Sequence, residues 1–204
     1  MRETHNERLS DILKRLANED NPNMTLGDIV RALGERAFGA LILLFAAPNL
    51  IPLPPGSSFV FGVPLVFITA QLMIKQNKIW LPQKLMDMKI GGGRLPYLLA
   101  RLVPYVMKVE KFLKPRGTLL TSSLGERLAG FAGLFVSIVL LLPIPGANMA
   151  PAFALCCFAL GLIEQDDLAM AGGWLGTIGT VVILYFLGSV AFLFLRTGID
   201  FFNL

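Results

Sequence analysis

The sequence lacks charged residues over three long stretches. Residues 37–74, 128–163 and 168–195 contain no Asp, Glu, Lys or Arg, although the chain carries 18 basic and 14 acidic side chains. A helix needs about 20 apolar residues to cross the hydrocarbon core of a bilayer. Each stretch is long enough to enter a membrane, which excludes an ordinary soluble enzyme, a nucleic-acid-binding protein and a secreted disulfide scaffold. The sequence therefore predicts an integral membrane protein.

Histidine and cysteine are almost absent. His5 is the only histidine, and Cys156 and Cys157 are adjacent inside an apolar stretch, where a disulfide between neighbours would be strained. Free cysteines in such a setting are typically small packing residues. The sequence also contains no nucleophile–base pair and no phosphate-binding loop. We therefore expect no metal site, no cofactor and no enzymatic activity.

The basic charge is concentrated between the first two apolar stretches. Residues 75–127 contain 11 Lys and Arg against three acidic residues. Such enrichment beside a membrane segment is typical of the cytoplasmic face and favours anionic lipid headgroups. We expect residues 76–123 to form a basic juxtamembrane segment, in which residues 95–113 have the spacing of an amphipathic helix. Membrane lipids are the expected partners, and nucleic acid is not.

The first 33 residues form a polar region of their own. Residues 1–36 hold 13 charged side chains, so we expect no signal peptide, and membrane insertion would begin at Ala37. Helical spacing of apolar residues predicts a cytosolic amphipathic cap over residues 1–33. Thr25 and Asp28 have the spacing of a helix capping box. The alternative is a solvated tail with one amphipathic helix.

Proline and glycine interrupt the first two apolar stretches. The breaks read PLPPG at residues 52–56 and PIPG at residues 143–146. Proline removes a backbone donor and clashes with the preceding helical turn. The sequence therefore predicts two membrane hairpins, over residues 34–75 and 124–165.

The arms before the breaks are short. They contain 14 residues (38–51) and 15 residues (128–142), or about 21–23 Å at 1.5 Å per residue, against a hydrocarbon core about 30 Å thick. A re-entrant hairpin that returns to the same membrane face and a full hairpin with a tight turn at the far face are both open. The short arms favour the re-entrant form.

The third apolar stretch predicts a conventional transmembrane helix over residues 168–195, followed by a short tail at 196–204. Gly172 and Gly176 have a spacing that lets helices approach closely. This glycine-rich helix makes a homo-oligomer one expected arrangement.

The two broken stretches resemble copies of one unit. Residues 33–36 and 124–127 both read LGER, at an offset of 91, and after the first break the offset becomes 90. The pairs that match at these offsets are Gly39 with Gly130, Pro52 with Pro143, Pro54 with Pro145, Gly56 with Gly146, Ser57 with Ala147, and Ser58 with Asn148. The sequence therefore predicts an internal duplication.

The breaks supply the first set of candidate binding residues. Backbone groups freed by proline cost several kcal/mol each in lipid, so a break must face protein or water. Small and polar side chains beside the breaks either satisfy these groups or bind a ligand, and helix N-termini favour anions. The candidates are Pro54, Gly56, Ser57, Ser58, Pro145, Gly146 and Asn148.

A second set of candidates lies where the two stretches begin. Glu35 with Arg36 and Glu126 with Arg127 are either interfacial anchors or charge pairs that line a polar cavity. For the second alternative we expect both pairs to be partly buried. The acidic loop at residues 164–167 is expected to be solvated.

The orientation of the two hairpins depends on residues 95–113. If this segment crosses the membrane, the hairpins are inverted relative to each other and the C-terminus is cytoplasmic. If it stays on the surface, both hairpins insert from the cytoplasm. The acidic loop and Arg196 favour the inverted arrangement, as do other membrane repeats.

These motifs together resemble the ExoD exopolysaccharide-synthesis family of bacterial membrane proteins. The residues that carry the resemblance read LGERAFG, PNLIPLPPGSS, AQLMIKQNKIWLP, LGERLAG, LPIPGANMAPA and LGLIEQDDL, between about residues 25 and 174. Gly146 departs from the bulkier residue expected there. The resemblance implies a bacterial inner-membrane protein of exopolysaccharide production, and it implies no catalytic residues. A weaker architectural likeness is to DedA-type membrane proteins, which also pair broken re-entrant hairpins.

Two functions follow as expectations. The first is a transporter-like protein that handles a lipid-linked or anionic substrate at the hairpin breaks. The second is a non-transporting assembly or regulatory subunit that contacts polysaccharide-synthesis machinery through the N-terminal cap and the basic segment.

Overall fold

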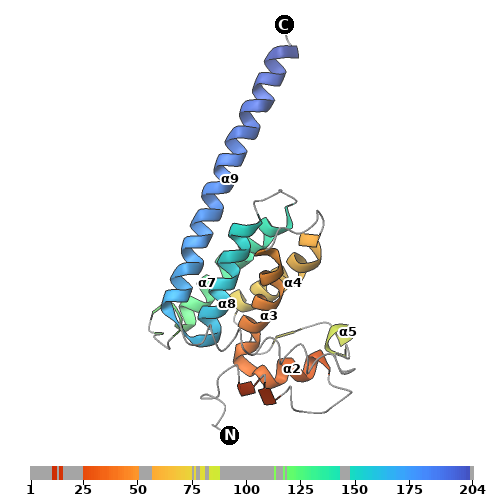
Figure 1. Ribbon diagram of the computed structural model, residues 1–204, viewed down its shortest axis with the longest axis vertical. Coiled ribbons are helices and arrows are strands. Elements are labelled where there is room, and N and C mark those ends of the chain that lie inside the picture. The colour runs from red at the N-terminus through yellow and green to blue at the C-terminus, as the bar shows by residue number, and fades with distance from the viewer. Residues whose placement is uncertain are drawn as a thin grey trace.

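Helices make up all the regular structure that the computed structural model describes (Figure 1). It describes residues 11–12, 14–15, 25–50, 57–74, 76, 79–80, 83–87, 113, 117, 119–142 and 148–202. The predicted all-α class is confirmed for these residues, whereas the expected amphipathic helix at 95–113 lies outside them. The elements are α2 (Leu26–Leu33), η1 (Gly34–Arg36), α3 (Ala37–Ala46), η2 (Ala47–Leu50), α4 (Ser57–Ile74), α5 (Gln83–Met86), α7 (Ser123–Leu141), α8 (Met149–Glu164) and α9 (Asp167–Phe202).

Two of the described helices are long and apolar enough to cross a membrane. They are α7 and the part of α9 from Asp167 to Val190. Helix α9 is longer than the predicted span at 168–195, because residues 196–202 continue it without a break. At about 1.5 Å per residue, a helix of this length reaches well past the others, as Figure 1 shows.

Large apolar side chains cover the outside of the bundle, and small residues are packed among larger ones inside it. Phe67, Phe131 and Phe153 are each more than half exposed, whereas Ala154 and Ala159 are completely buried. A soluble protein seldom exposes so much contiguous apolar surface. Small residues between helices and large ones outside are the pattern that lipid favours.

The predicted capping box begins α2. The Thr25 hydroxyl accepts a hydrogen bond from the Asp28 N–H, and the Asp28 carboxylate accepts from the Thr25 N–H at 3.0 Å. Hydrogen bonds from the Thr25 hydroxyl and backbone N–H hold the pKa of Asp28 below its usual range. Val30 and Leu33 are buried on one face of the helix, so an amphipathic helix before the first apolar stretch is confirmed.

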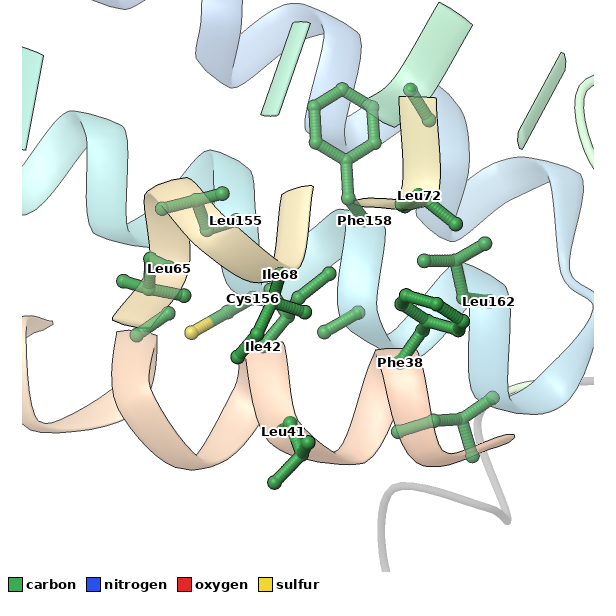
Figure 2. Close-up of a cluster of buried hydrophobic side chains, with 14 of the residues drawn as sticks. Phe38, Leu41, Ile42, Leu65, Ile68, Leu72, Leu155, Cys156, Phe158 and Leu162 are labelled. Carbon is green, nitrogen blue, oxygen red and sulfur yellow. The ribbon is translucent and has the colours of Figure 1, made fainter. Parts of the chain in front are cut away.

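The bundle is built from two helical hairpins whose arms pack crosswise. The first hairpin comprises α3, η2 and α4, and the second comprises α7 and α8. Helix α3 packs against α8, and α4 packs against α7. Figure 2 shows part of the core between them, with Phe38 and Ile42 from α3, Leu65 and Ile68 from α4, and Leu155 and Phe158 from α8.

Glycines bring the two hairpins into backbone contact. A Cβ added to Gly39 would lie 2.8 Å from the Ala159 carbonyl oxygen and 2.7 Å from the Ile163 side chain. A Cβ added to Gly130 would lie 2.5 Å from the Met73 backbone nitrogen. Each glycine thus sits at the start of one hairpin and touches the end of the other.

These contacts fix how the hairpins are oriented. The start of α3 lies beside the end of α8, and the start of α7 lies beside the end of α4. We call this the charged end of the bundle, and the opposite end, where α4 and α8 begin, the break end. The first residues of α4 and α8 therefore lie at the same end (Figure 1). The predicted inverted arrangement is wrong for the described helices, since inversion would place the start of each hairpin beside the break of the other.

Helix α9 packs against α8 through glycine. Gly161 meets Met170, Gly173 meets the Phe158 ring, and Gly176 meets Ala154, so any added Cβ would clash. The Phe158 and Trp174 rings add an edge-to-face contact with centroids 5.8 Å apart. Gly172 also faces the chain's own Cys157, so both Gly172 and Gly176 make contacts within the chain.

The acidic residues at the start of α9 are built into the fold. The Asp167 carboxylate accepts hydrogen bonds from the Leu119 N–H at 3.1 Å and from the Thr121 N–H and hydroxyl at 3.0 Å. Asp166 is 1% exposed, and its carboxylate accepts from the Leu168 N–H. The expectation of a solvated acidic loop is wrong for these two residues, because Asp167 joins the start of α9 to the segment before α7 and Asp166 is buried.

Replacing the contact glycines tests this packing. We expect Gly39→Ala and Gly130→Ala each to lower the free energy of unfolding by about 1–3 kcal/mol, because the added methyl group overlaps a backbone that cannot retreat. Gly179→Ala is the matched control, since nothing lies within 4 Å of its Cβ position. Thermal unfolding of the purified protein measures the effect. Equal stability of all three variants would contradict the described packing.

Candidate functional site

The predicted site residues do not form one site. Glu35, Arg36, Glu126 and Arg127 belong to η1 and the first turns of α7, at the charged end. Ser57, Ser58 and Asn148 belong to the break end. About 14 residues of α7 separate the two ends, or roughly 21 Å. The remaining candidates, Pro54, Gly56, Pro145 and Gly146, lie outside the described residues.

A hydrogen bond joins the two hairpins at the break end. The Asn148 side-chain amide nitrogen donates to the Ser58 hydroxyl at 2.7 Å. Asn148 precedes α8 but makes no side-chain capping bond to it. Its side chain instead reaches across to the start of α4. The structure therefore brings together two candidate residues that are 90 positions apart in the sequence. The predicted duplication aligns the same two residues with each other.

Asn49 is a polar residue of the break end that the sequence reasoning missed. It lies in η2, which packs against α8 and α4, and it is 3% exposed. Its amide nitrogen donates to the Phe45 carbonyl at 2.9 Å, but its Oδ1 atom has no hydrogen-bond partner among the described residues. No motif in the sequence marks Asn49 as a candidate site residue. Only its burial in the structure identifies it.

Ser137 repeats this feature in the second hairpin. It is completely buried in α7, about one turn before that helix ends, and its hydroxyl also lacks a partner among the described residues. A buried polar group without a partner costs about 1–3 kcal/mol. Both of these residues lie in the last turns of a first arm as it approaches its break.

The charged end does not contain the expected buried pair in the second hairpin. Glu126 is half-buried, whereas Arg127 is exposed. Adjacent residues on a helix point in different directions, which is why these two do not share one environment. The prediction of a partly buried pair is therefore wrong for Arg127. Arg36, at the equivalent position of the first hairpin, is half-buried.

Gln71 has a structural role rather than a place in the site. Its Oε1 atom accepts from the Trp80 N–H at 2.6 Å, and its amide nitrogen donates to the Trp80 carbonyl at 2.9 Å. This paired contact holds the segment after α4 against the helix. The sequence marked Gln71 only as a polar residue in an apolar stretch.

The described residues contain no group of three or more His, Cys, Asp or Glu side chains that could hold a metal ion. What the break end offers instead is uncharged hydrogen-bonding chemistry. Asn148, Ser58, Asn49 and Ser137 supply amides and hydroxyls. No Asp, Glu, Lys or Arg occurs within residues 37–74, 128–163 or 168–195.

An all-helical bundle with apolar outer surfaces and two helices long enough to cross a bilayer is consistent with the class of membrane proteins. The family model described as "Exopolysaccharide synthesis, ExoD" matches residues 9–186. The chain belongs to the ExoD family, and its role therefore lies in exopolysaccharide synthesis.

Two relatives illustrate this membership. The chain is 33% identical to Protein ExoD of Rhizobium meliloti over 193 residues, which cover 90% of this chain and 79% of the relative. It is 29% identical to an uncharacterised protein of Synechocystis sp. over 180 residues, which cover 87% of this chain and 84% of that one. No solved structure shows significant similarity to the chain.

The unpartnered amide of Asn49 can be tested through stability. Leu140, which aligns with Asn49 at the sequence offset of 91, is completely buried. We expect Asn49→Leu to raise the free energy of unfolding by about 1 kcal/mol, because it replaces an unsatisfied polar group with an apolar one of similar shape. Asn148→Leu should lower stability, since it breaks a satisfied hydrogen bond. Thermal unfolding in detergent distinguishes the two, and destabilisation by both would contradict the assignment.

Proposed function

We propose that this protein is a transporter-like membrane protein that handles a lipid-linked precursor of exopolysaccharide at the break end, and that it is not an enzyme. The observation that carries the proposal is the hydrogen bond between Asn148 and Ser58, which joins the two breaks inside a charge-free part of the chain. Membership of an exopolysaccharide family supports the substrate class. The absence of charge at this end favours a lipid-linked substrate over a free anion.

Under this proposal, the two hairpins are copies related by a two-fold axis that runs along the helices. Three contacts support this relation, since each joins positions that the offsets of 91 and 90 make equivalent. Gly39 contacts Ile163 just as Gly130 contacts Met73, and Ser58 bonds Asn148 across the axis. Burial agrees with this, because equivalent core positions are buried in both copies, as in Leu65 with Leu155, Ile68 with Phe158 and Leu72 with Leu162.

The hairpins are re-entrant in this proposal. The charge-free part of each first arm has about 14 residues, or roughly 21 Å, whereas the charge-free part of α9 has 28 residues, or roughly 42 Å. With their charged ends at one membrane surface, the breaks stop several ångströms short of the far side of a core about 30 Å thick. Helix α9 alone continues across as the C-terminal span.

The orientation follows from the shared charged end. Both hairpins begin and end there, so residues 76 and 119–122, the described ends of the basic segment, lie on that side of the membrane. The excess of Lys and Arg in residues 75–122 favours the cytoplasmic side of a bacterial inner membrane. The N-terminal cap shares this side and contacts lipid headgroups. The break end then faces the extracytoplasmic side, and so does the C-terminus after α9.

Reporter fusions test this orientation. We expect alkaline phosphatase fused after Leu204 to be active and a fluorescent protein fused there to be dark, because α9 carries the C-terminus out of the cytoplasm. The matched control is a fusion after Asp87, in the basic segment, which should give fluorescence without phosphatase activity. Fluorescence at both positions would contradict this orientation and indicate that the C-terminus is cytoplasmic.

A non-transporting assembly subunit is the second candidate function. The tight core between the hairpins favours it, since Leu65, Ile68 and Leu155 are completely buried and leave no open path along the axis. Partners would then be other membrane proteins of polysaccharide synthesis, or a second copy of this chain that contacts the exposed part of α9.

Lipid movement distinguishes the two functions. Proteoliposomes containing the full chain and a fluorescently labelled glucosyl diacylglycerol report translocation through loss of fluorescence to an external quencher. The transporter-like function predicts faster loss than in protein-free vesicles, and about tenfold slower movement for Asn148→Leu, the effect of about 1.4 kcal/mol. Ser189→Ala, which alters an exposed hydroxyl of α9 bonded to its own helix, is the control. Lipid movement no faster than in protein-free vesicles would contradict the transporter-like function and favour the assembly function.

A further inference from the structure

Two polar atoms near the break end are buried without a hydrogen-bond partner among the described residues. The Asn49 Oδ1 atom and the Ser137 hydroxyl are each at least 97% buried, and neither has a hydrogen-bond partner among the described residues. Because α3 runs antiparallel to α8, with Gly39 beside Ala159 and Ile163, the register places Asn49 beside the first turn of α8, next to Asn148. The break end therefore contains two unpartnered hydrogen-bonding atoms as well as the hydrogen bond between Asn148 and Ser58.

We propose that the break end binds the uncharged, hydroxyl-bearing head of a membrane amphiphile, with Asn49, Ser137 and Asn148 as the recognising side chains. A hydroxyl group both donates and accepts hydrogen bonds. It therefore suits both the unpartnered Oδ1 acceptor of Asn49 and the Ser137 hydroxyl. This inference rests on the proposed function and deepens it by naming the chemistry of the substrate.

Charge argues against an anionic head at this position. The hairpin arms and the apolar part of α9 contain no Lys or Arg. The cations Arg36 and Arg127 lie at the charged end, about 21 Å away along the helices. An ion taken from water into such surroundings without a counter-charge carries a large desolvation cost, whereas a hydroxyl needs only hydrogen-bond partners.

Native mass spectrometry of the full chain in detergent tests the inference with two probes that share their dioleoyl chains. One is glucosyl diacylglycerol, which is uncharged, and the other is phosphatidic acid, which is anionic. We expect the protein to retain the glucosyl lipid in preference. Asn49→Leu and Ser137→Ala should each lower its retention by roughly twofold to tenfold, the range for one hydrogen bond.

Thr69→Val is the matched control, because it removes a buried hydroxyl that already bonds the Leu65 carbonyl of its own helix at 2.7 Å. Thermal unfolding of each variant establishes that it is folded. Equal or stronger retention of phosphatidic acid, or unchanged retention of the glucosyl lipid by Asn49→Leu and Ser137→Ala, would overturn the inference. If the glucosyl lipid binds as expected but does not move in proteoliposomes, the site stands and the transporter-like function fails.

Discussion

The close approach of helix backbones at a few glycines is the constraint on which this structure depends. In lipid, apolar side chains gain little by leaving their surroundings, so helix association relies on dense packing and short contacts. Gly39 and Gly130 let each hairpin reach the backbone of the other, and Gly161, Gly173 and Gly176 do the same between α8 and α9. Several phenylalanines, such as Phe67, Phe131 and Phe153, lie on the outer surface.

This packing also determines where polarity is concentrated. Antiparallel contact between α3 and α8, and between α4 and α7, brings every charged terminus of the hairpins to one end and both breaks to the other. The Asp167 carboxylate then ties the start of α9 to the backbone before α7 at the charged end. At the break end the corresponding link is the uncharged bond between Asn148 and Ser58. One end is suited to water and headgroups, and the other to hydrogen bonding in apolar surroundings.

The two hairpins differ at the positions proposed to bind a ligand. At the sequence offset of 91, Asn49 aligns with Leu140 and Ser137 aligns with Ala46, and all four are buried. Each hairpin thus contributes one polar group where the other has an apolar residue. Packing alone would favour the apolar choice at both positions, since an unpartnered polar atom destabilises a core. Two such groups near the breaks are therefore consistent with a functional demand rather than a structural one.

The sequence by itself determined the helical class, the capping box at Thr25 and Asp28, the breaks and the offsets of 91 and 90. Each of these depends on local chemistry, namely charge-free length, side-chain spacing and the missing N–H of proline. Only the tertiary structure decided that the hairpins share one orientation, that Asp166 and Asp167 are hydrogen-bonded within the fold, and that Asn49 is buried without a partner. The physical reason is that these features depend on which helix faces lie together. Contacts between residues far apart in the sequence, such as Gly130 with Met73 and Asn148 with Ser58, set that arrangement, and a pattern within one segment does not specify it.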